Sequence, residues 1–257
     1  MNILNSEKVT KRFGGLEAIC DLDIQVEENS ITSIIGPNGA GKTTFFNCIT
    51  GYYRPENGQI LFKDKKINQF LPNEIASMGV SRTYQNIRLF ANLTALENIL
   101  IGRHSHQNAN LADVLLSNKK QRTEEKMALE EALQILDFMG LKGLGDTLAR
   151  NLPYGAQRRL EIARALANKP ALLLLDEPTA GMNPKEKMEM MALIRRLREK
   201  FSITILLIEH DVNLVMRISE KVIALDFGKK IAEGKPQEIQ HNPLVIEAYL
   251  GRAPVSA

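Results

Sequence analysis

The stretch "ITSIIGPNGAGKTTFFNCITG", residues 31–51, decides the fold of this 257-residue chain. Its apolar start, residues 31–35, predicts a strand that is buried on both faces. The segment from Lys42 to the closing Gly51 predicts a helix. Between them, "GPNGAGKT" (36–43) fits the pattern G-x-x-x-x-G-K-[ST], in the strand–loop–helix context that a phosphate-binding loop needs. The stretch therefore predicts an α/β domain that holds phosphate groups where the helix begins.

Each part of this phosphate loop (36–43) has an expected task. Gly36, Gly39 and Gly41 let the backbone wrap so that its N–H groups face phosphate oxygens. Lys42 brings a positive charge to the β- and γ-phosphates, and the Thr43 hydroxyl is expected to hold Mg²⁺. The residues expected to bind ATP here are Gly36, Pro37, Asn38, Gly39, Ala40, Gly41, Lys42, Thr43 and Thr44.

Two further apolar runs end in polar residues. "LLLLDE" (172–177) places Asp176 and Glu177 at the carboxyl end of a strand, where open α/β sheets bind ligands. Asp176 is expected to hold Mg²⁺, and Glu177 to act as the general base on water. His210 ends the run "ITILLIEH" at the same edge, where it is expected to bond the γ-phosphate. The alternatives are a solvated turn or helix cap for the two carboxylates and an ordinary boundary residue for His210.

The order of strand and helix patterns predicts a mostly parallel core sheet, preceded by an antiparallel N-terminal β portion. Residues 1–85 and 161–230 are expected to form the nucleotide-binding α/β core. Residues 86–160 contain no candidate for a buried strand and are expected to form an inserted helical subdomain. Residues 231–257 are expected to form a C-terminal tail.

Two residues outside these motifs are candidates on weaker grounds. Gln85, in "RTYQNIRLF", lies at the border of the helical insert, and its carboxamide oxygen is suited to Mg²⁺ or to the attacking water. A solvated glutamine is the alternative. Phe13, in "KRFGG", is expected to stack on adenine, and packing in the core is the alternative.

The segment "NLPYGAQRRLEIARAL" (151–166) predicts a turn that ends at Gly155, followed by an amphipathic helix. A glycine turn at a helix N-terminus is an anion site. Because the chain already has one triphosphate loop, this second half-site indicates a dimer in which each turn covers the partner's ATP. The alternative is a tight loop before an amphipathic helix. In either case Arg158, Arg159 and Glu161 are expected on the outer face of the helix. The residues expected to touch ATP across the dimer are Leu152, Pro153, Tyr154, Gly155 and Ala156.

Bulk composition narrows the class of protein. Charged residues make up 25% and hydrophobic residues 44% of the chain, as in ordinary globular proteins. A net charge of +3 lacks the concentrated basic character of a nucleic-acid binder, so no nucleic-acid partner is expected. The N-terminus has no signal-peptide pattern, and no apolar run approaches the roughly 20 residues of a spanning helix. A partner would have to hold the chain at a membrane.

Together these residues resemble the ATP-binding cassette of ABC transporters over nearly the whole chain, as one such domain. The resemblance implies a P-loop NTPase (RecA-like) core and head-to-tail dimers that hold two ATP molecules. It assigns the following parts: Walker A to 36–43, the adenine aromatic to Phe13, the Q-loop to Gln85, the signature to 152–156, Walker B to 172–177 with Glu177 catalytic, the D-loop to 180–183, and the switch histidine to His210.

Within this family, the chain is similar to ATPase subunits of branched-chain or neutral amino-acid importers. The similarity rests on "RFGGLEAI" (12–19), "RTYQNIRLFANLTALEN" (82–98), "NLPYGAQRRLEIARAL", the polar insert at 102–123 and the "IEAYLG" segment (246–251). It implies a second, different ATPase subunit, two transmembrane permeases and an extracytoplasmic solute-binding protein. It also implies a peripheral position on the cytoplasmic face of the membrane.

Three positions depart from the usual family pattern. Pro153 stands in place of the signature serine, Ala156 in place of the signature glutamine, and Asn183 in place of the D-loop aspartate. The contact across the dimer should therefore be weaker and made by backbone N–H groups. A partner with a fuller signature would make the two ATP sites unequal.

Other classes of ATP- or GTP-binding protein are the alternatives to an ABC transporter subunit. A GTPase should carry N-K-x-D, but "NKKQ" (118–121) lacks the Asp, and kinases rarely place Glu directly after the Walker B Asp. Soluble cassettes that act on nucleic acid or ribosomes usually have two cassettes or long coiled coils, which this chain lacks. A cassette for another solute, such as urea, or for export stays open, because an ATPase subunit does not touch the solute.

Overall fold

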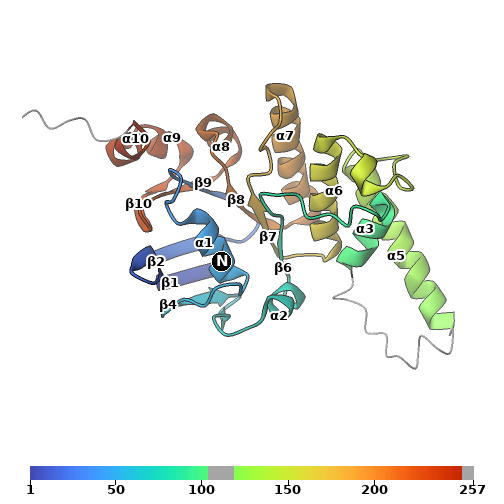
Figure 1. The fold of residues 1–257 in the computed structure, drawn as a ribbon, viewed down its shortest axis with the longest axis horizontal. Helices are drawn as coiled ribbons and strands as arrows, with labels where there is room; N and C mark the ends of the chain where they lie inside the picture. Colours follow the sequence, from blue (N-terminus) through green and yellow to red (C-terminus); the bar gives the residue numbers. More distant parts are fainter. Residues whose placement is uncertain (104–118, 251–257) are drawn as a thin grey trace, which may run out of the picture. The chain divides into compact units, whose positions relative to one another are not determined.

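The structure is a computed structural model that describes residues 1–103 and 119–250, without the side chains of 119–122 (Figure 1). Its internal contacts divide the chain into two compact units. The first unit comprises Met1–Ile75 and Ala171–Ala257, and the second comprises Ala76–Pro170.

The second unit extends past the predicted helical insert, 86–160, at both of its ends. At the start it takes in β6 (Val80–Arg82), and at the end it takes in the whole of α6 (Tyr154–Ala167). A boundary at residue 160 would cut α6 in the middle, because the helix is continuous there.

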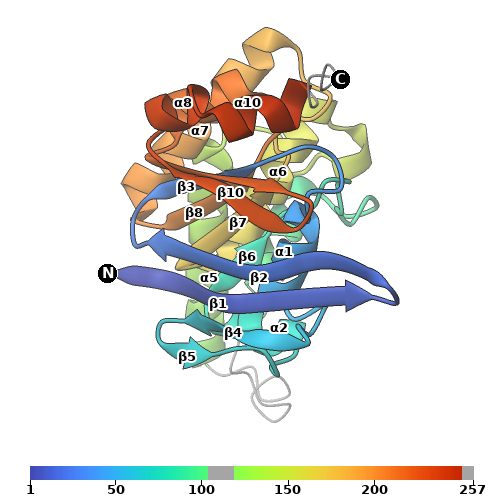
Figure 2. The ribbon, with the colours of Figure 1, turned by 90° about the vertical axis from the view of Figure 1, so that its left-hand side faces the viewer.

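The first unit contains the predicted antiparallel N-terminal strands and the predicted parallel core strands. The antiparallel sheet has the order β2-β1-β4-β5, and Figure 2 shows β2, β1 and β4 side by side. In the core, β3 pairs in parallel with β8 and β9, β7 pairs in parallel with β8, and β10 pairs antiparallel with β9. The strands are β1 (Asn2–Phe13), β2 (Leu16–Glu27), β3 (Ile31–Ile35), β4 (Asn57–Phe62), β5 (Lys65–Lys66), β7 (Leu172–Asp176), β8 (Thr204–Ile208), β9 (Lys221–Asp226) and β10 (Lys229–Gly234).

Strand register brings the predicted site residues to one edge of the core. Every residue of β3, β7 and β8 is buried, which confirms the prediction drawn from their continuous apolar runs. Asp176, the last residue of β7, lies opposite Ile208, the last residue of β8. Because parallel strands end at the same edge, residues 176–177 and 209–210 emerge side by side.

The helices of the first unit include α1, which the sequence predicted after the phosphate loop. They are α1 (Lys42–Ile49), α7 (Pro184–Phe201), α8 (Val212–Ile218), α9 (Pro236–Gln240) and α10 (Pro243–Leu250), while α2 (Pro72–Ser77) spans a boundary between the units. Asn183 caps α7: its Oδ1 accepts the Glu186 N–H at 3.0 Å, and the Glu186 carboxylate accepts the Asn183 N–H at 3.0 Å. The unusual Asn183 therefore has a local task, since such a cap satisfies N–H groups at the helix start.

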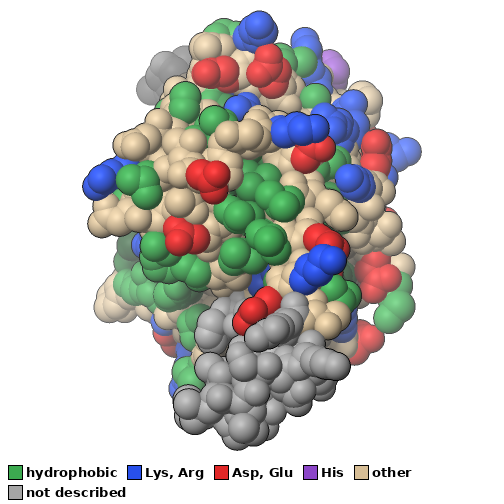
Figure 3. All heavy atoms as spheres, turned by 90° about the vertical axis from the view of Figure 1, so that its right-hand side faces the viewer, with side chains coloured by type: hydrophobic (Ala, Val, Ile, Leu, Met, Phe, Trp, Pro, Cys, Tyr) green, Lys and Arg blue, Asp and Glu red, His purple; other side chains and the backbone are tan. Residues whose placement is uncertain are grey.

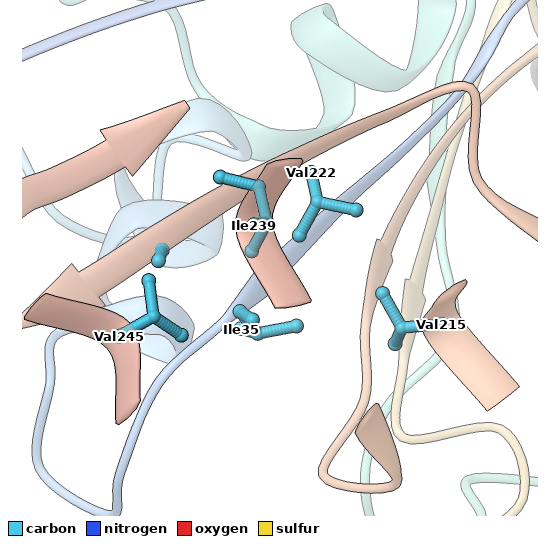
Figure 4. Close-up of a cluster of buried hydrophobic side chains, with 6 residues drawn as sticks. Ile35, Val215, Val222, Ile239 and Val245 are labelled. Atoms are coloured by element: carbon cyan, nitrogen blue, oxygen red, sulfur yellow. The ribbon is translucent and has the colours of Figure 1, made fainter. Parts of the chain in front are cut away.

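The segment predicted as a C-terminal tail forms regular structure up to Leu250. It adds β10 to the edge of the core and then forms α9 and α10. Ile239 of α9 and Val245 of α10 are buried in one cluster with Ile35 of β3 (Figure 4). The end of the chain is therefore packed against the strand that leads into the phosphate loop.

The second unit is mainly helical, as the sequence predicted for most of its length. Its helices are α3 (Ala95–Gly102), α5 (Lys119–Phe138), the 3₁₀ turn Ala149–Asn151 and α6. Asn98 of α3 is fully buried, donates to the Phe90 and Thr94 carbonyls at 3.1 and 2.9 Å, and accepts the Phe90 N–H at 2.9 Å. These bonds fix the chain segment that leads into α3. Most of the predicted polar insert, 102–123, lies outside the described residues.

Candidate nucleotide site

The phosphate loop has the backbone conformation that its glycines predict. Gly41, just before α1, has φ 96°, and a Cβ there would lie 2.5 Å from the Ala18 carbonyl oxygen. Gly36 has φ 151°, and a Cβ would lie 2.2 Å from the Leu225 carbonyl oxygen. The Ala40 N–H closes the turn on the Pro37 carbonyl at 3.2 Å. Larger residues at 36 and 41 would push the loop off the neighbouring strands.

Lys42 points back into this loop. Its side chain is buried, and Nζ donates to the Gly36 and Pro37 carbonyls, each at 2.8 Å. Burial lowers the pKa of Lys42, while the negative charges of Glu177 and Asp176 act in the opposite direction. A buried ammonium group next to a glycine-rich loop at a helix start is suited to phosphate oxygens. Asn38, Gly39 and Thr43 are exposed, Pro37 and Thr44 are half-buried, and Ala40 is buried.

Glu177 and His210 are in direct contact. His210 Nε2 lies 2.6 Å from Glu177 Oε1, with 42% of the His210 side chain and 12% of the Glu177 side chain exposed. Glu177 has φ 49°, in the left-handed region, and its N–H donates to the Ile208 carbonyl at 2.9 Å. The turn therefore aims the carboxylate toward His210 rather than continuing β7. The sequence predicted that these two residues emerge at one edge, and the structure brings them together.

Glu209 belongs to this edge, and the sequence analysis missed it. It is 3% exposed; Oε1 accepts the Thr179 N–H at 2.9 Å and the Thr179 hydroxyl at 2.6 Å, and Oε2 accepts the His210 N–H at 3.2 Å. Burial raises the pKa of Glu209, opposed mainly by the bonds from Thr179. The side chain thus ties the turn that carries Glu177 to the turn that carries His210. The sequence feature that could have indicated Glu209 is a carboxylate directly before His210, at the end of an apolar strand.

The oxygen donors near Lys42 suit Mg²⁺. Thr43 offers a hydroxyl and Asp176 a carboxylate, both hard oxygen ligands of the kind that Mg²⁺ prefers. Asp176 is 1% exposed, and its charge acts on Lys42, the residue next to Thr43. Among the described residues, no group of three His, Cys, Asp or Glu forms a metal cluster by itself. The protein donors therefore fit an ion that also takes oxygens from a bound triphosphate.

Phe13 is on the surface, and its packing differs from the core alternative. It is 42% exposed, and its ring meets the Tyr53 ring edge-on with centroids 5.1 Å apart. Lys11 Nζ lies 5.2 Å from the centroid of the Phe13 ring. Stacking on a base requires an exposed face of an aromatic ring, and the Phe13 ring is partly exposed. Adenine binding by Phe13 stays a prediction.

The predicted signature segment opens α6 in the second unit. The helix begins at Tyr154, so Gly155 lies within its first turn instead of ending the preceding one. Pro153 occupies the cap position without a side-chain cap bond, and its carbonyl accepts the Ala156 N–H at 2.9 Å. Leu152 and Ala156 are buried, Gly155 is half-buried, and Pro153 and Tyr154 are exposed. The exposed start of a helix leaves backbone N–H groups for a ligand.

The expectation that Arg158 and Glu161 lie on the outer face of α6 is wrong. They are 3% and 1% exposed. Arg158 donates to the Tyr84 carbonyl at 2.8 Å and to the Gln85 carbonyl, and the Arg88 N–H donates to Glu161 at 3.1 Å. Burial raises the pKa of Glu161, opposed by the bond from Arg88 and by the Arg158 charge. Helix α6 therefore clamps the backbone of the segment that carries Gln85, because the two charged side chains pair and bind peptide groups.

Replacing Arg158 by Ala should lower the free energy of unfolding of the second unit by about 3 kcal/mol, because it leaves buried Glu161 and two carbonyls without their cation. Urea denaturation followed by circular dichroism measures this change. Arg150→Ala is the matched control: its Nη1 makes an exposed bond to Asn92 at 2.8 Å, so a change below about 0.5 kcal/mol is expected. Equal stability of the two variants would contradict the clamp.

The site residues thus fall into two sets. The first unit brings together Lys42, Asp176, Glu177 and His210. The second unit brings the Gln85 backbone to α6, while the Gln85 side chain is exposed. The roles of Gln85 in binding Mg²⁺ and of 152–156 in binding ATP across a dimer stay predictions.

Comparison with known families agrees with this geometry. Residues 19–180 match the family model described as ABC transporter, and residues 229–254 match one described as branched-chain amino acid ATP-binding cassette transporter. A curated relative is the high-affinity branched-chain amino acid transport ATP-binding protein BraF of Pseudomonas aeruginosa. It is 46% identical over 251 residues, which cover 98% of each chain.

Solved structures agree as well. A crystal structure of the ADP conformation of an ATP-binding cassette of an ABC transporter has a TM-score of 0.85 and 34% identity, and covers 98% of this chain and 100% of that one. A dimeric post-hydrolysis ATP-binding cassette bound to ADP and Pi has a TM-score of 0.76 and 26% identity, over 91% and 98% of the two chains. The extent of these matches and the geometry of the phosphate loop lead to the same conclusion: the chain belongs to the ATP-binding subunits of ABC transporters.

Proposed function

We propose that the chain is the ATP-hydrolysing subunit of a membrane importer for branched-chain amino acids. The observation that carries this proposal is the placement of Lys42, Asp176, Glu177 and His210 at one edge of the core sheet. The 46% identity to a branched-chain amino acid transport ATP-binding protein supports the choice of solute. The match covers 98% of both chains, so it supports assigning to this chain the function of the whole subunit and not that of a single motif.

The chemistry proposed for this edge is hydrolysis of ATP to ADP and phosphate. Loop N–H groups and Lys42 bind the β- and γ-phosphates, and Thr43, Asp176 and Gln85 would hold Mg²⁺, which neutralises phosphate charge. Glu177 accepts a proton from water as the water oxygen bonds to the γ-phosphorus and the bond to ADP oxygen breaks. His210 bonds the γ-phosphate and, through its contact with Oε1, holds the Glu177 carboxylate in place.

The working unit is proposed to be a dimer in which the start of α6 covers ATP bound by the partner. Support comes from the exposed first turn of α6 and from the dimeric cassette among the similar structures. ATP joins the subunits because its γ-phosphate gains contacts from both of them only when they are closed. Hydrolysis removes these contacts, and the dimer reopens. The second ATPase subunit is proposed to be a different chain with its own signature.

Permease subunits are the proposed link to the membrane. In the described part of the chain no helix combines the length and the apolar composition needed to cross a bilayer. The exposed hydrophobic side chains of the second unit include Phe90, Ile101, Met127, Leu129 and Leu133. Figure 3 shows hydrophobic side chains gathered on one face of the molecule. Exposed apolar patches commonly mark protein contacts. We assign this surface to permeases at the cytoplasmic face, which receive solute from an extracytoplasmic binding protein.

Reconstitution tests the proposal. Purification of the chain with its bound membrane subunits from the host, followed by insertion into liposomes with the binding protein, should give ATP-dependent uptake of leucine, isoleucine or valine. The Glu177→Gln complex is the inactive control. Uptake of urea but not of these amino acids would overturn the assigned solute, and co-purification with RNA alone would overturn the transport function.

A further inference from the structure

A hydrogen bond joins the last helix of the chain to the first residue of the phosphate loop. The Gly36 N–H donates to the Tyr249 hydroxyl at 2.8 Å, across 213 positions of sequence. Tyr249 is the second-last residue of α10, and 38% of its surface is exposed. Burial around its hydroxyl raises the pKa of Tyr249, so the phenol is neutral at physiological pH. The loop therefore has a polar contact to a segment far outside the motifs that define it.

The Tyr249 hydroxyl is the acceptor that the structure shows for the N–H of Gly36. The residue is buried and follows the last residue of β3, at the point where the strand becomes the loop. A buried N–H without an acceptor costs about 1–3 kcal/mol, so the phenol oxygen favours this orientation of the peptide. On the other side of the same residue, the Gly36 carbonyl accepts Lys42 Nζ at 2.8 Å. Tyr249 and Lys42 thus hold the two peptide groups of Gly36, and rotation about Gly36 would disturb both.

Packing of α10 reinforces this bond. Val245, one helical turn before Tyr249, lies in the buried cluster with Ile35, the residue just before Gly36 (Figure 4). Residues four apart in a helix share one face, so Val245 and Tyr249 both lie on the face of α10 that contacts the end of β3. Helix α10 is therefore attached to two consecutive residues, Ile35 by apolar contact and Gly36 by a hydrogen bond.

Space remains next to this attachment. A cavity of about 630 Å³ is lined on one side by residues 37–40 of the loop and on the other by Leu244, Glu247 and Ala248 of α10. The outer side of the loop is therefore not packed tightly against the helix. Residues 37–40 therefore border open space, whereas the Gly36 N–H is bonded to Tyr249.

We propose that Tyr249 is a positioning residue of the nucleotide site, and that through it the C-terminal helix α10 both sets the phosphate loop and responds to nucleotide. This inference rests on the proposed binding of nucleotide at that loop. Because coupling between sites is reciprocal, a helix that favours the nucleotide-binding form of the loop must itself be stabilised when nucleotide binds. Tyr249 lies within residues 229–254, which match the family described as branched-chain amino acid ATP-binding cassette transporter.

Titration of the full chain with Mg·ADP in a calorimeter tests the first half of the proposal. Tyr249→Phe keeps the ring and removes the acceptor, and should raise the Kd for ADP about threefold to tenfold. In ATPase assays of the assembled complex, KM should rise by a similar factor while kcat changes little. Leu250→Ala, at a neighbouring residue that is 81% exposed, should leave the Kd unchanged. Unfolding temperatures measured without nucleotide show whether either variant is unstable.

Hydrogen exchange of the wild-type chain, which does not depend on how the variant folds, tests the second half: ADP should slow amide exchange in residues 244–250. As an additional comparison, Tyr249→Phe should lose this protection. Wild-type affinity in Tyr249→Phe, or unchanged exchange in α10 on binding ADP, would overturn the inference. Such a result would leave the proposed function standing as long as wild type binds ADP and Lys42→Ala does not. Failure of the wild type itself to bind ADP would instead refute the proposed function.

Discussion

Glu177→Gln should lower ATP turnover by at least about 100-fold while leaving ATP binding intact. Glutamine has nearly the same shape, so it preserves the turn at φ 49° and an oxygen for His210, but it accepts no proton from water. The expected state is a complex that binds ATP and stays closed, because the γ-phosphate contacts persist. Phosphate release by the assembled complex, measured at saturating ATP, gives the turnover. Size-exclusion chromatography with ATP shows whether dimers accumulate.

The control for this change is Glu189→Gln on the exposed side of α7, which makes the same chemical substitution away from the site. It should hydrolyse ATP at the wild-type rate. If the Glu177 variant also kept the wild-type rate, another group would have to take the proton from water. The assignment of the general base would then be wrong.

Lys42→Ala should weaken binding of ADP and ATP by about 100-fold or more, equivalent to roughly 2.7 kcal/mol. Lys42 is 6% exposed and already desolvated, and its two partners are carbonyls of the loop itself. Phosphate oxygens that replace these carbonyls gain a charge-assisted bond, and alanine offers none. Calorimetric titration with Mg·ADP measures the loss directly. Lys185→Ala, an exposed change at the start of α7, should bind as wild type does.

The pH dependence of binding gives a second test of Lys42. Because burial lowers the pKa of Lys42, the unbound site loses its positive charge as the pH rises through that lowered value. Phosphate favours the protonated form, so wild-type affinity should fall over that alkaline range, and Lys42→Ala should lose this dependence. An unchanged pH profile in the variant would show that another group sets it.

The parts of the fold that the sequence predicted are those in which burial leaves a continuous pattern. β3, β7 and β8 are buried on both faces, so they appear as nearly continuous apolar runs, and the candidate site residues follow them. The phosphate loop was predictable because only glycine tolerates its backbone at 36 and 41. The sequence could place Asp176, Glu177 and His210 at one edge because a strand end fixes where a residue emerges.

The residues that escaped prediction act through partners far away in the chain. Arg158 appeared to belong to the solvated face of α6, but its partners are backbone carbonyls at residues 84 and 85, which no periodicity reveals. Tyr249 was part of a resemblance without an assigned task, because its partner is 213 positions away. Glu209 was missed for a different reason. A carboxylate is expected to be solvated, and only the structure shows that Thr179 donates to Glu209 and allows it to be buried.

The neighbouring ends of β7 and β8 have a kinetic consequence. Strands hold Glu177 and His210 in contact before any ligand arrives, so this half of the proposed catalytic site is preorganised and needs no slow assembly. On the proposed dimer, the missing half comes only with a second chain. When the two ATPase subunits are mixed at equal concentrations, hydrolysis should therefore be second order in protein when dilute, and should become first order once dimers saturate.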